Sequence, residues 1–171
     1  MEDLGWDDPG SEASLIYVVG RVNQGIRREL GALLQVWGLS VQEYTSLSVL
    51  GSRPGLSNAQ LARRALVTPQ SMLEILARLE ARGLIRRNVD SEHRRIRRAE
   101  LTASGRRLLR TTAPRIDALQ DRIFADVPPR QRRAVLAALM AAMNQLSSHS
   151  ADSASRRPVA RPSPTVPAAW E

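Results

Sequence analysis

Residues 68–83 constrain the fold of this chain most strongly, because they carry both ends and one face of a helix. A threonine cap followed by proline at the first helical position is typical of a helix start, and Thr68 and Pro69 supply it. Gly83 predicts the end, because glycine accepts the positive φ that commonly follows a helix. Apolar residues at three- and four-residue spacing predict one buried face. They are Met72, Ile75, Leu76 and Leu79.

The opposite face of this predicted helix is polar. It carries Gln70, Ser71, Glu74 and Arg78. A recognition helix needs this arrangement, because its first turn must reach base edges in a major groove while its other face stays anchored. A shorter helix opens at Ser57 with a capping-box pattern and extends through Ala65, so the pair predicts a helix-turn-helix over about residues 57–83.

Arginine dominates the segment that follows. Residues 82–98 hold Arg82, Arg86, Arg87, Arg94, Arg95, Arg97 and Arg98. Only Asp90 and Glu92 oppose them, and Asp90 followed by Ser91 is a typical turn start. A β-hairpin over about residues 84–101 would project guanidinium groups beyond the domain, although its second strand is weak by composition. Arginine is favoured where phosphate is bound or a narrow minor groove is entered.

Four motifs in this region resemble, in order and spacing, the signature of the MarR (multiple antibiotic resistance regulator) family. They are Val67-Thr68-Pro69, Leu79 to Arg87, Asp90 to Arg95 and Leu101 to Gly105. Members of that family are winged-helix transcription regulators that act as homodimers. The resemblance extends over about residues 14–148. It implies a mainly α fold with a small β-hairpin wing, a winged helix-turn-helix domain whose long N- and C-terminal helices form the dimer.

The resemblance implies a function as well: a sequence-specific DNA-binding repressor that recognises a pseudo-palindromic operator in double-stranded DNA. The recognition-helix residues are then Thr68, Gln70, Ser71, Glu74 and Arg78. The wing residues are Arg86, Arg94, Arg95 and Arg97, and either Arg94 or Arg95 enters the minor groove. The phosphate-contact candidates are Ser57, Arg63 and Arg64. Each basic candidate could equally be a solvated surface charge.

A small-molecule switch is also implied, because MarR-like dimers often release DNA when a small aromatic or phenolic effector binds. Its cleft lies between the dimer helices and the winged-helix lobe. Tyr17, Trp37 and Tyr44 lie on the elements that usually line that cleft. Ordinary packing is the alternative interpretation for all three.

The chain departs from the family pattern at two positions. His93 stands where the wing usually has a second aspartate, which commonly braces a wing arginine. Glu74 stands where the recognition helix often has a basic residue; glutamate can accept a hydrogen bond from cytosine N4, but it repels phosphate. These departures keep two alternatives open: a winged-helix protein-interaction module without specific DNA recognition, and a non-specific basic DNA-binding protein.

Long apolar stripes mark both ends of the predicted domain. Residues 14–37 predict one helix, and residues 102–146 predict two, with a kink at Pro114 and a break at Pro128-Pro129. They hold more apolar surface than a small helix-turn-helix body covers. They pack either within one chain or against a second copy, and the resemblance implies the second copy. The dimerisation candidates are Leu15, Val19, Val22, Leu136, Leu139 and Met143.

Charge is distributed unevenly along the chain. The net charge of +8 comes from 25 cationic residues, all arginine, and 17 acidic ones. Residues 1–12 hold five acids and no arginine, whereas residues 13–148 hold 22 arginines and ten acids, or +12. A basic domain indicates a polyanionic partner, most often nucleic acid. Residues 1–13 predict a disordered acidic leader, and residues 149–171 a disordered tail rich in Pro, Ser and Ala.

Several classes of protein are excluded or not expected. The absence of cysteine excludes disulfides, thiolate metal sites and cysteine-based redox sensing. No nucleophile–base pair, carboxylate pair, phosphate-binding loop or metal-ligand cluster is apparent, so we expect neither an enzyme nor a cofactor or metal. The acidic N-terminus lacks a signal-peptide pattern, and no stretch approaches the length of a membrane span. We therefore expect a cytoplasmic protein without a membrane partner.

Overall fold

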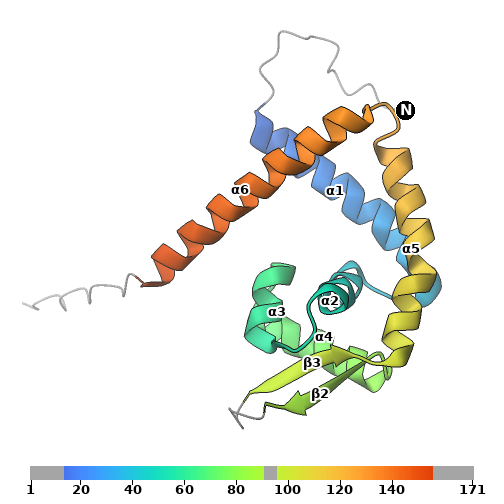
Figure 1. The fold of residues 1–171 in the computed structure, drawn as a ribbon, viewed down its shortest axis with the longest axis vertical. Helices are drawn as coiled ribbons and strands as arrows, with labels where there is room; N and C mark the ends of the chain where they lie inside the picture. The colour runs from blue at the N-terminus through green and yellow to red at the C-terminus, as the bar shows by residue number, and fades with distance from the viewer. Residues whose placement is uncertain (1–13, 91–95, 156–171) are drawn as a thin grey trace, which may run out of the picture. The chain divides into compact units, whose positions relative to one another are not determined.

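The computed structural model describes residues 14–90 and 96–155 (Figure 1). The chain divides into two units, residues 1–123 and 124–171, and each is described by itself. The first unit contains α1 (Leu15–Leu34), the 3₁₀ helix η1 (Gln35–Trp37), α2 (Val41–Ser52), β1 (Leu56–Ser57), α3 (Asn58–Ala65), α4 (Pro69–Ala81), β2 (Ile85–Val89), β3 (Arg97–Leu101) and α5 (Ala103–Ile123). The second contains α6 (Pro129–Ser155). The fold is mainly helical with one small sheet, as predicted.

The sheet is antiparallel, and its three strands lie in the order β1-β3-β2. The predicted wing hairpin is confirmed, with Ile85 opposite Leu101 and Val89 opposite Arg97. β1 was not predicted, and it precedes α3 directly. Its Leu56 pairs with Ala99, a pairing too short to leave a periodic pattern in the sequence.

Local capping signals fix the ends of the helices as predicted. The hydroxyl of Thr68 accepts a hydrogen bond from the backbone N–H of Ser71, and Pro69 is the first residue of α4. Ser57 and Gln60 form the expected capping box of α3. α4 ends at Ala81, and Gly83 follows in the left-handed region with a φ of 65°. These caps hold α3 and α4 at the predicted positions of a helix-turn-helix.

One face of α4 is buried in an aliphatic core. The predicted stripe of Met72, Ile75, Leu76 and Leu79 is buried against residues of α1, α2, α3 and the sheet. Burial of such side chains stabilises a fold by about 1.5–3 kcal/mol each. The polar face of the same helix therefore remains at the surface.

The wing is joined closely to α5. Thr102 caps α5 by accepting a hydrogen bond from the N–H of Gly105, and its own N–H donates to the carbonyl of Leu84. A side chain at Gly105 would place its Cβ 2.1 Å from the Leu84 carbonyl oxygen, so glycine is required there. Pro114 lies inside α5, as predicted.

α6 extends further than the sequence predicted. It continues to Ser155, past the expected end near Leu146 and into the stretch expected to be disordered. The reason is that no proline or glycine interrupts residues 130–157, and alanine is frequent there. The acidic leader, residues 156–171, and the wing-tip residues His93, Arg94 and Arg95 lie outside the described residues. Within the described ranges, no helix has the length and apolarity that crossing a membrane requires.

Candidate nucleic-acid interface

The first turns of α4 present an exposed polar row. Thr68, Gln70, Ser71 and Glu74 are all exposed, as predicted for residues that meet DNA. The Thr68 hydroxyl donates to the Oγ of Ser71 at 2.9 Å, which leaves the Ser71 hydroxyl proton available to an external acceptor. Asn58 of α3 donates to the Pro69 carbonyl at 3.0 Å, so the start of α4 is held in place by the preceding helix.

Arg78 lies further along α4 and has a structural partner. Its Nε donates to Oε1 of Glu43 in α2 at 3.1 Å. Burial alone would raise the pKa of Glu43, but hydrogen bonds from the N–H of Ser40 and from Arg78 outweigh it and lower the pKa below its usual value. A charged Glu43 therefore ties α4 to α2, a role that the spacing of Arg78 did not reveal.

Leu73 is a candidate that the sequence analysis missed. It lies on α4 between Gln70 and Glu74 and is 44% exposed, whereas the stripe from Met72 to Leu79 is buried. The base contacts predicted from the sequence are all polar, although apolar side chains contact the thymine methyl group in a major groove. The position of Leu73 outside the apolar stripe is the feature of the sequence that indicates an exposed apolar side chain.

Most arginines of the wing strands are paired with acids. Arg86 of β2 donates to Glu100 of β3 at 2.9 Å. Arg87 pairs with Glu80 at the end of α4, and the hydrogen bond from Arg87 is the main cause that lowers the Glu80 pKa. Arg97 is exposed and makes no ion pair with a described residue.

A buried carboxylate braces the wing. Asp90 pairs with Arg98, whose Nη1 also donates to the Gly55 carbonyl at 3.0 Å. This contact links the end of β2, β3 and the turn before β1. The brace of the described wing is thus Asp90 with Arg98; the position of His93, where the family has an aspartate, is outside the described residues.

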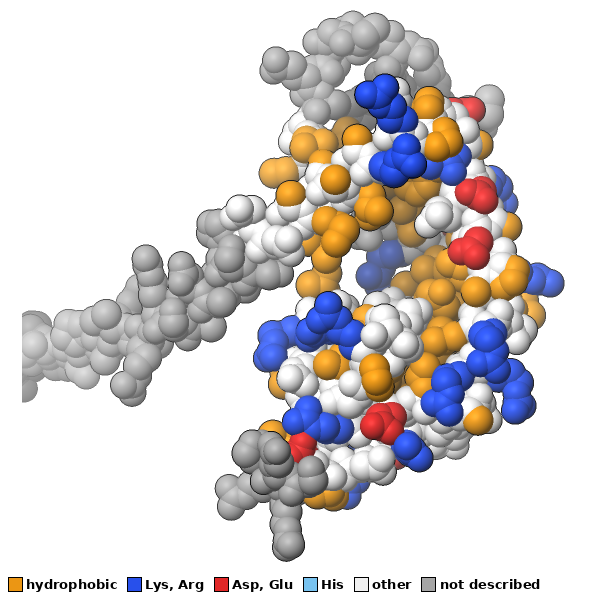
Figure 2. Space-filling view, in the orientation of Figure 1, with side chains coloured by type: hydrophobic (Ala, Val, Ile, Leu, Met, Phe, Trp, Pro, Cys, Tyr) orange, Lys and Arg blue, Asp and Glu red, His pale blue; other side chains and the backbone are white. Residues whose placement is uncertain are grey.

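α3 contributes the phosphate-contact candidates. Arg63 and Arg64 lie in its last turn and are exposed, while the Ser57 hydroxyl already accepts from the N–H of Gln60 at 3.3 Å. Basic side chains are prominent on the face seen in Figure 2, and acidic ones are sparse there. The described part of the chain contains no group of three or more His, Asp or Glu side chains that could hold a metal ion.

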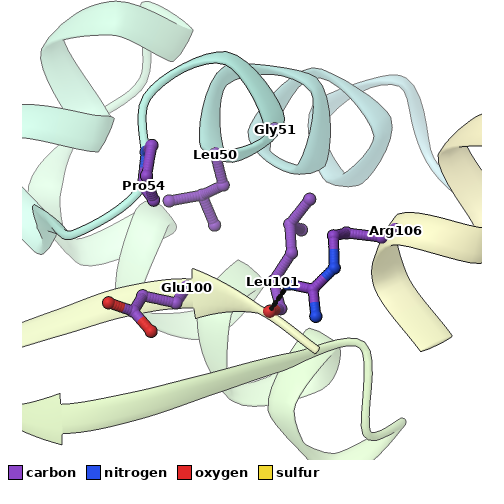
Figure 3. A pocket seen from close by; sticks show the side chains of 6 residues that line it. All are labelled: Leu50, Gly51, Pro54, Glu100, Leu101 and Arg106. Carbon is purple, nitrogen blue, oxygen red and sulfur yellow. Dashed lines mark hydrogen bonds between the residues drawn. The ribbon is translucent and has the colours of Figure 1, made fainter. Parts of the chain in front are cut away.

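The predicted effector residues are not gathered into one described pocket. Trp37 and Tyr44 are half-buried, Tyr17 is exposed, and the guanidinium carbon of Arg115 lies 5.8 Å from the centroid of the Trp37 ring. A pocket of about 250 Å³ lies elsewhere, between the end of α2, β3 and the start of α5 (Figure 3). It is lined by Leu50, Gly51, Pro54, Glu100, Leu101 and Arg106.

The dimerisation candidates are exposed in the single chain. Leu15 of α1 is 77% exposed and Leu136 of α6 is 60% exposed. Val19, Val22, Leu139 and Met143 are exposed as well. Apolar patches of this kind are characteristic of contact surfaces between proteins.

Comparison with known proteins places this geometry among transcription regulators. The model of the MarR family matches residues 37–96. The HTH-type transcriptional repressor Rv2887 of Mycobacterium tuberculosis is 38% identical over 122 residues, which cover 71% of this chain and 88% of the relative. The solved structure of the Mycobacterium tuberculosis MarR family protein Rv2887 in complex with DNA has a TM-score of 0.64 and 36% identity, covering 75% of this chain and 97% of that chain. Its complex with p-aminosalicylic acid has a TM-score of 0.63, 36% identity and the same coverage.

Proposed function

Because this chain belongs to the MarR family, we propose that it is a sequence-specific DNA-binding repressor that binds a pseudo-palindromic operator as a homodimer. The observation that carries the proposal is the exposed polar row of α4, from Thr68 to Glu74, on a helix whose other face is fixed in the core. Rigid support matters because base-edge hydrogen bonds require the side chains to reach fixed positions in the groove.

The recognition helix divides its contacts by chemistry. Gln70 offers both a donor and an acceptor, the pattern that pairs with adenine, and Glu74 accepts from the N4 amino group of cytosine. Thr68 and Ser71 contact bases or the nearest phosphates at the start of the helix, where its dipole favours negative charge. Leu73 packs against a thymine methyl group. Arg78 supports this face from its ion pair with Glu43.

The wing and α3 hold the duplex backbone. Arg86 and Arg97 are exposed on the wing strands, and Arg63 and Arg64 are exposed on α3. These two groups are the proposed phosphate contacts on either side of the groove. Either Arg94 or Arg95 enters the minor groove from the wing tip, as the sequence predicts. Phosphate contacts position the protein, whereas the α4 contacts specify the sequence.

Pairing of the exposed apolar faces of α1 and α6 forms the homodimer. A two-fold dimer presents two copies of α4 to half-sites about 34–36 Å apart, which is one turn of the duplex. The single-chain mass is 18.9 kDa, so light scattering distinguishes a dimer from a monomer directly. A monomer at that mass would overturn this part of the proposal.

A small aromatic or phenolic acid is the proposed effector that releases DNA. The solved complex of Rv2887 with p-aminosalicylic acid supports this chemical class. In this chain, Trp37 and Tyr44 offer aromatic surface, and Arg115 brings a cation to the Trp37 ring. Addition of salicylate to the protein–operator complex should lower its DNA affinity, whereas a Trp37→Ala variant should respond less. Equal responses would exclude Trp37 from the effector site.

The function is tested by fluorescence anisotropy with a duplex from the region upstream of its own gene and a scrambled duplex, across a salt series. A specific repressor binds the upstream duplex more tightly, and its affinity falls steeply with salt. Equal binding to both duplexes would favour a non-specific basic DNA-binding protein. No binding to either at low salt would favour a protein-interaction module. Arg94→Ala with Arg95→Ala should weaken binding and flatten the salt dependence.

A further inference from the structure

Arg82 makes a contact that has no part in the proposed base contacts of α4 or in the proposed phosphate contacts of the wing. It is the first residue after α4, and its guanidinium reaches back to the joint between α1–η1 and α2. Nη1 donates to the carbonyl of Gly38 and Nη2 donates to the carbonyl of Trp37, both at 2.8 Å. A single side chain thus binds two consecutive carbonyls far from it in the sequence.

The chemistry of this contact is that of a helix cap supplied from outside. η1 ends at Trp37, and Gly38 follows in the left-handed region with a φ of 59°. The last carbonyls of a helix lack partners within it and carry partial negative charge. The planar fork of a guanidinium matches two adjacent carbonyls and brings the complementary charge, whereas the three donors of a lysine ammonium diverge from one nitrogen and form no planar fork. Arg82 therefore fixes both the distance and the relative orientation between the end of α4 and the end of η1.

The joint that Arg82 holds also contacts other elements. The Trp37 ring lies beside Arg115 of α5, and the Glu43 carboxylate accepts from the N–H of Ser40 at 2.9 Å and from Arg78. Arg78 of α4 and Arg82, the first residue after it, thus both bind within residues 37–43. The core that packs against α4 is aliphatic. Aliphatic packing is non-directional, so it restrains sliding and rotation of α4 less than hydrogen bonds of defined geometry do.

We propose that Arg82 is a positioning residue that sets α4 relative to α1 and α5, and thereby sets the half-site spacing that the dimer accepts. The inference rests on the proposed function, in which α1 belongs to the dimer interface. Arg82 itself makes no DNA contact in this proposal. Loss of its two hydrogen bonds lets α4 adopt a range of orientations, so the dimer binds its best operator less well and rejects altered spacings less sharply.

The test measures Arg82→Gln by anisotropy on the preferred duplex and on duplexes with one base pair inserted or removed between the half-sites. We expect a loss of affinity on the order of tenfold for the preferred duplex and little change for the altered ones. The salt dependence of binding should stay the same, because no phosphate contact is lost. Arg86→Gln is the contrasting variant: it removes a proposed phosphate contact of β2, so it should lower both the affinity and the salt dependence on every duplex without changing the spacing preference.

Three outcomes would overturn the proposal. The first is a spacing preference in Arg82→Gln equal to that of the wild type, and the second is a salt slope smaller by about one, which would make Arg82 a phosphate contact. Arg82→Lys keeps the charge but lacks the planar fork, so it replaces Arg82→Gln in the experiment if Arg82→Gln fails to fold. The third outcome is a spacing preference in Arg82→Lys equal to that of the wild type. Failure of the proposed function is separate, since the wild type itself would then show no preference among duplexes.

Discussion

Arg78 of α4 and Glu43 of α2 form an ion pair in which Nε and Oε1 are 3.1 Å apart, and the carboxylate is buried while the guanidinium is largely exposed. The folded-state pKa of Glu43 is lowered, so its ionisation contributes stability above the unfolded-state value of 4.5 and loses it as the pH falls through the folded-state value. Glu80 behaves in the same direction through Arg87. We therefore expect the free energy of unfolding to decrease as the pH is lowered below 4.5.

Glu43→Gln should remove part of this pH dependence and cost about 1 kcal/mol of unfolding free energy near neutral pH. Urea unfolding of both proteins between about pH 7 and about pH 3 measures the difference. Glu74→Gln is the control, because Glu74 is exposed and forms no ion pair with a described residue. Identical pH profiles for the wild type and Glu43→Gln would contradict the assigned role of the ion pair.

Leu66→Gly should stabilise the protein. Leu66 joins α3 to α4 with a φ of 54°, a conformation that costs a non-glycine residue roughly 1–2 kcal/mol. Its side chain is 88% exposed, so little packing is lost when it is removed. Glycine also raises the entropy of the unfolded chain, which offsets part of this gain. The free energy of unfolding should therefore increase by about 0.5–1 kcal/mol, which urea unfolding measures.

Leu66→Ala separates the two effects in that experiment. It removes the same exposed methyl groups but keeps a Cβ in the left-handed conformation. Its stability should stay close to that of the wild type. A gain in Leu66→Ala as large as that in Leu66→Gly would show that the side chain, and not the backbone conformation, is responsible.

Gly105→Ala should destabilise the protein by about 2 kcal/mol or more, because the added Cβ would meet backbone that cannot move independently. That backbone is the Leu84 carbonyl, with the oxygen 2.1 Å from the ideal Cβ position. Thermal unfolding measures the loss, with Ser104→Ala as the control at an exposed neighbour in the same helix. Equal midpoints for the two variants would mean that the Leu84 backbone and α5 are not packed this closely.

Leu73→Ala should weaken operator binding by about three- to tenfold, if thymine methyl contact is worth about 1 kcal/mol. Replacement of single thymines by uracil removes only the 5-methyl group from the duplex. One such replacement should weaken binding of the wild type but not of Leu73→Ala, which identifies the contacted base. Additive losses at every thymine would exclude the contact, and Ser104→Ala controls for effects unrelated to α4.

Local signals explain which parts of this fold were predictable. The caps at Ser57 and Thr68 and the left-handed glycine at Gly83 depend on neighbours within a few residues, so the sequence locates them well. The buried stripe of α4 follows from helical periodicity alone. The hairpin followed from its turn and from the family resemblance.

The contacts that were not predicted join distant parts of the chain. β1 pairs with β3 through Leu56 and Ser57, next to the hydrogen bond from the Gly55 N–H to the Ala99 carbonyl, and Arg82 contacts the end of η1 from 45 residues away in the sequence. The spacing of Arg78 predicts a place on the groove-facing side of α4, yet no pattern in the sequence indicates that Glu43 lies beside it. Such pairings are products of tertiary packing and leave no periodic trace.

The ion pairs made by arginines of the wing strands affect how strongly DNA binding depends on salt. Arg86, Arg87 and Arg98 each have a carboxylate partner, so their charges already have protein counterions. When an arginine leaves a carboxylate for a phosphate, the freed carboxylate takes up a cation, so the net release of cations is smaller than for an arginine without a carboxylate partner. The salt dependence of DNA binding should therefore be less steep than it would be if all the arginines behind the +12 of residues 13–148 were free to bind phosphate.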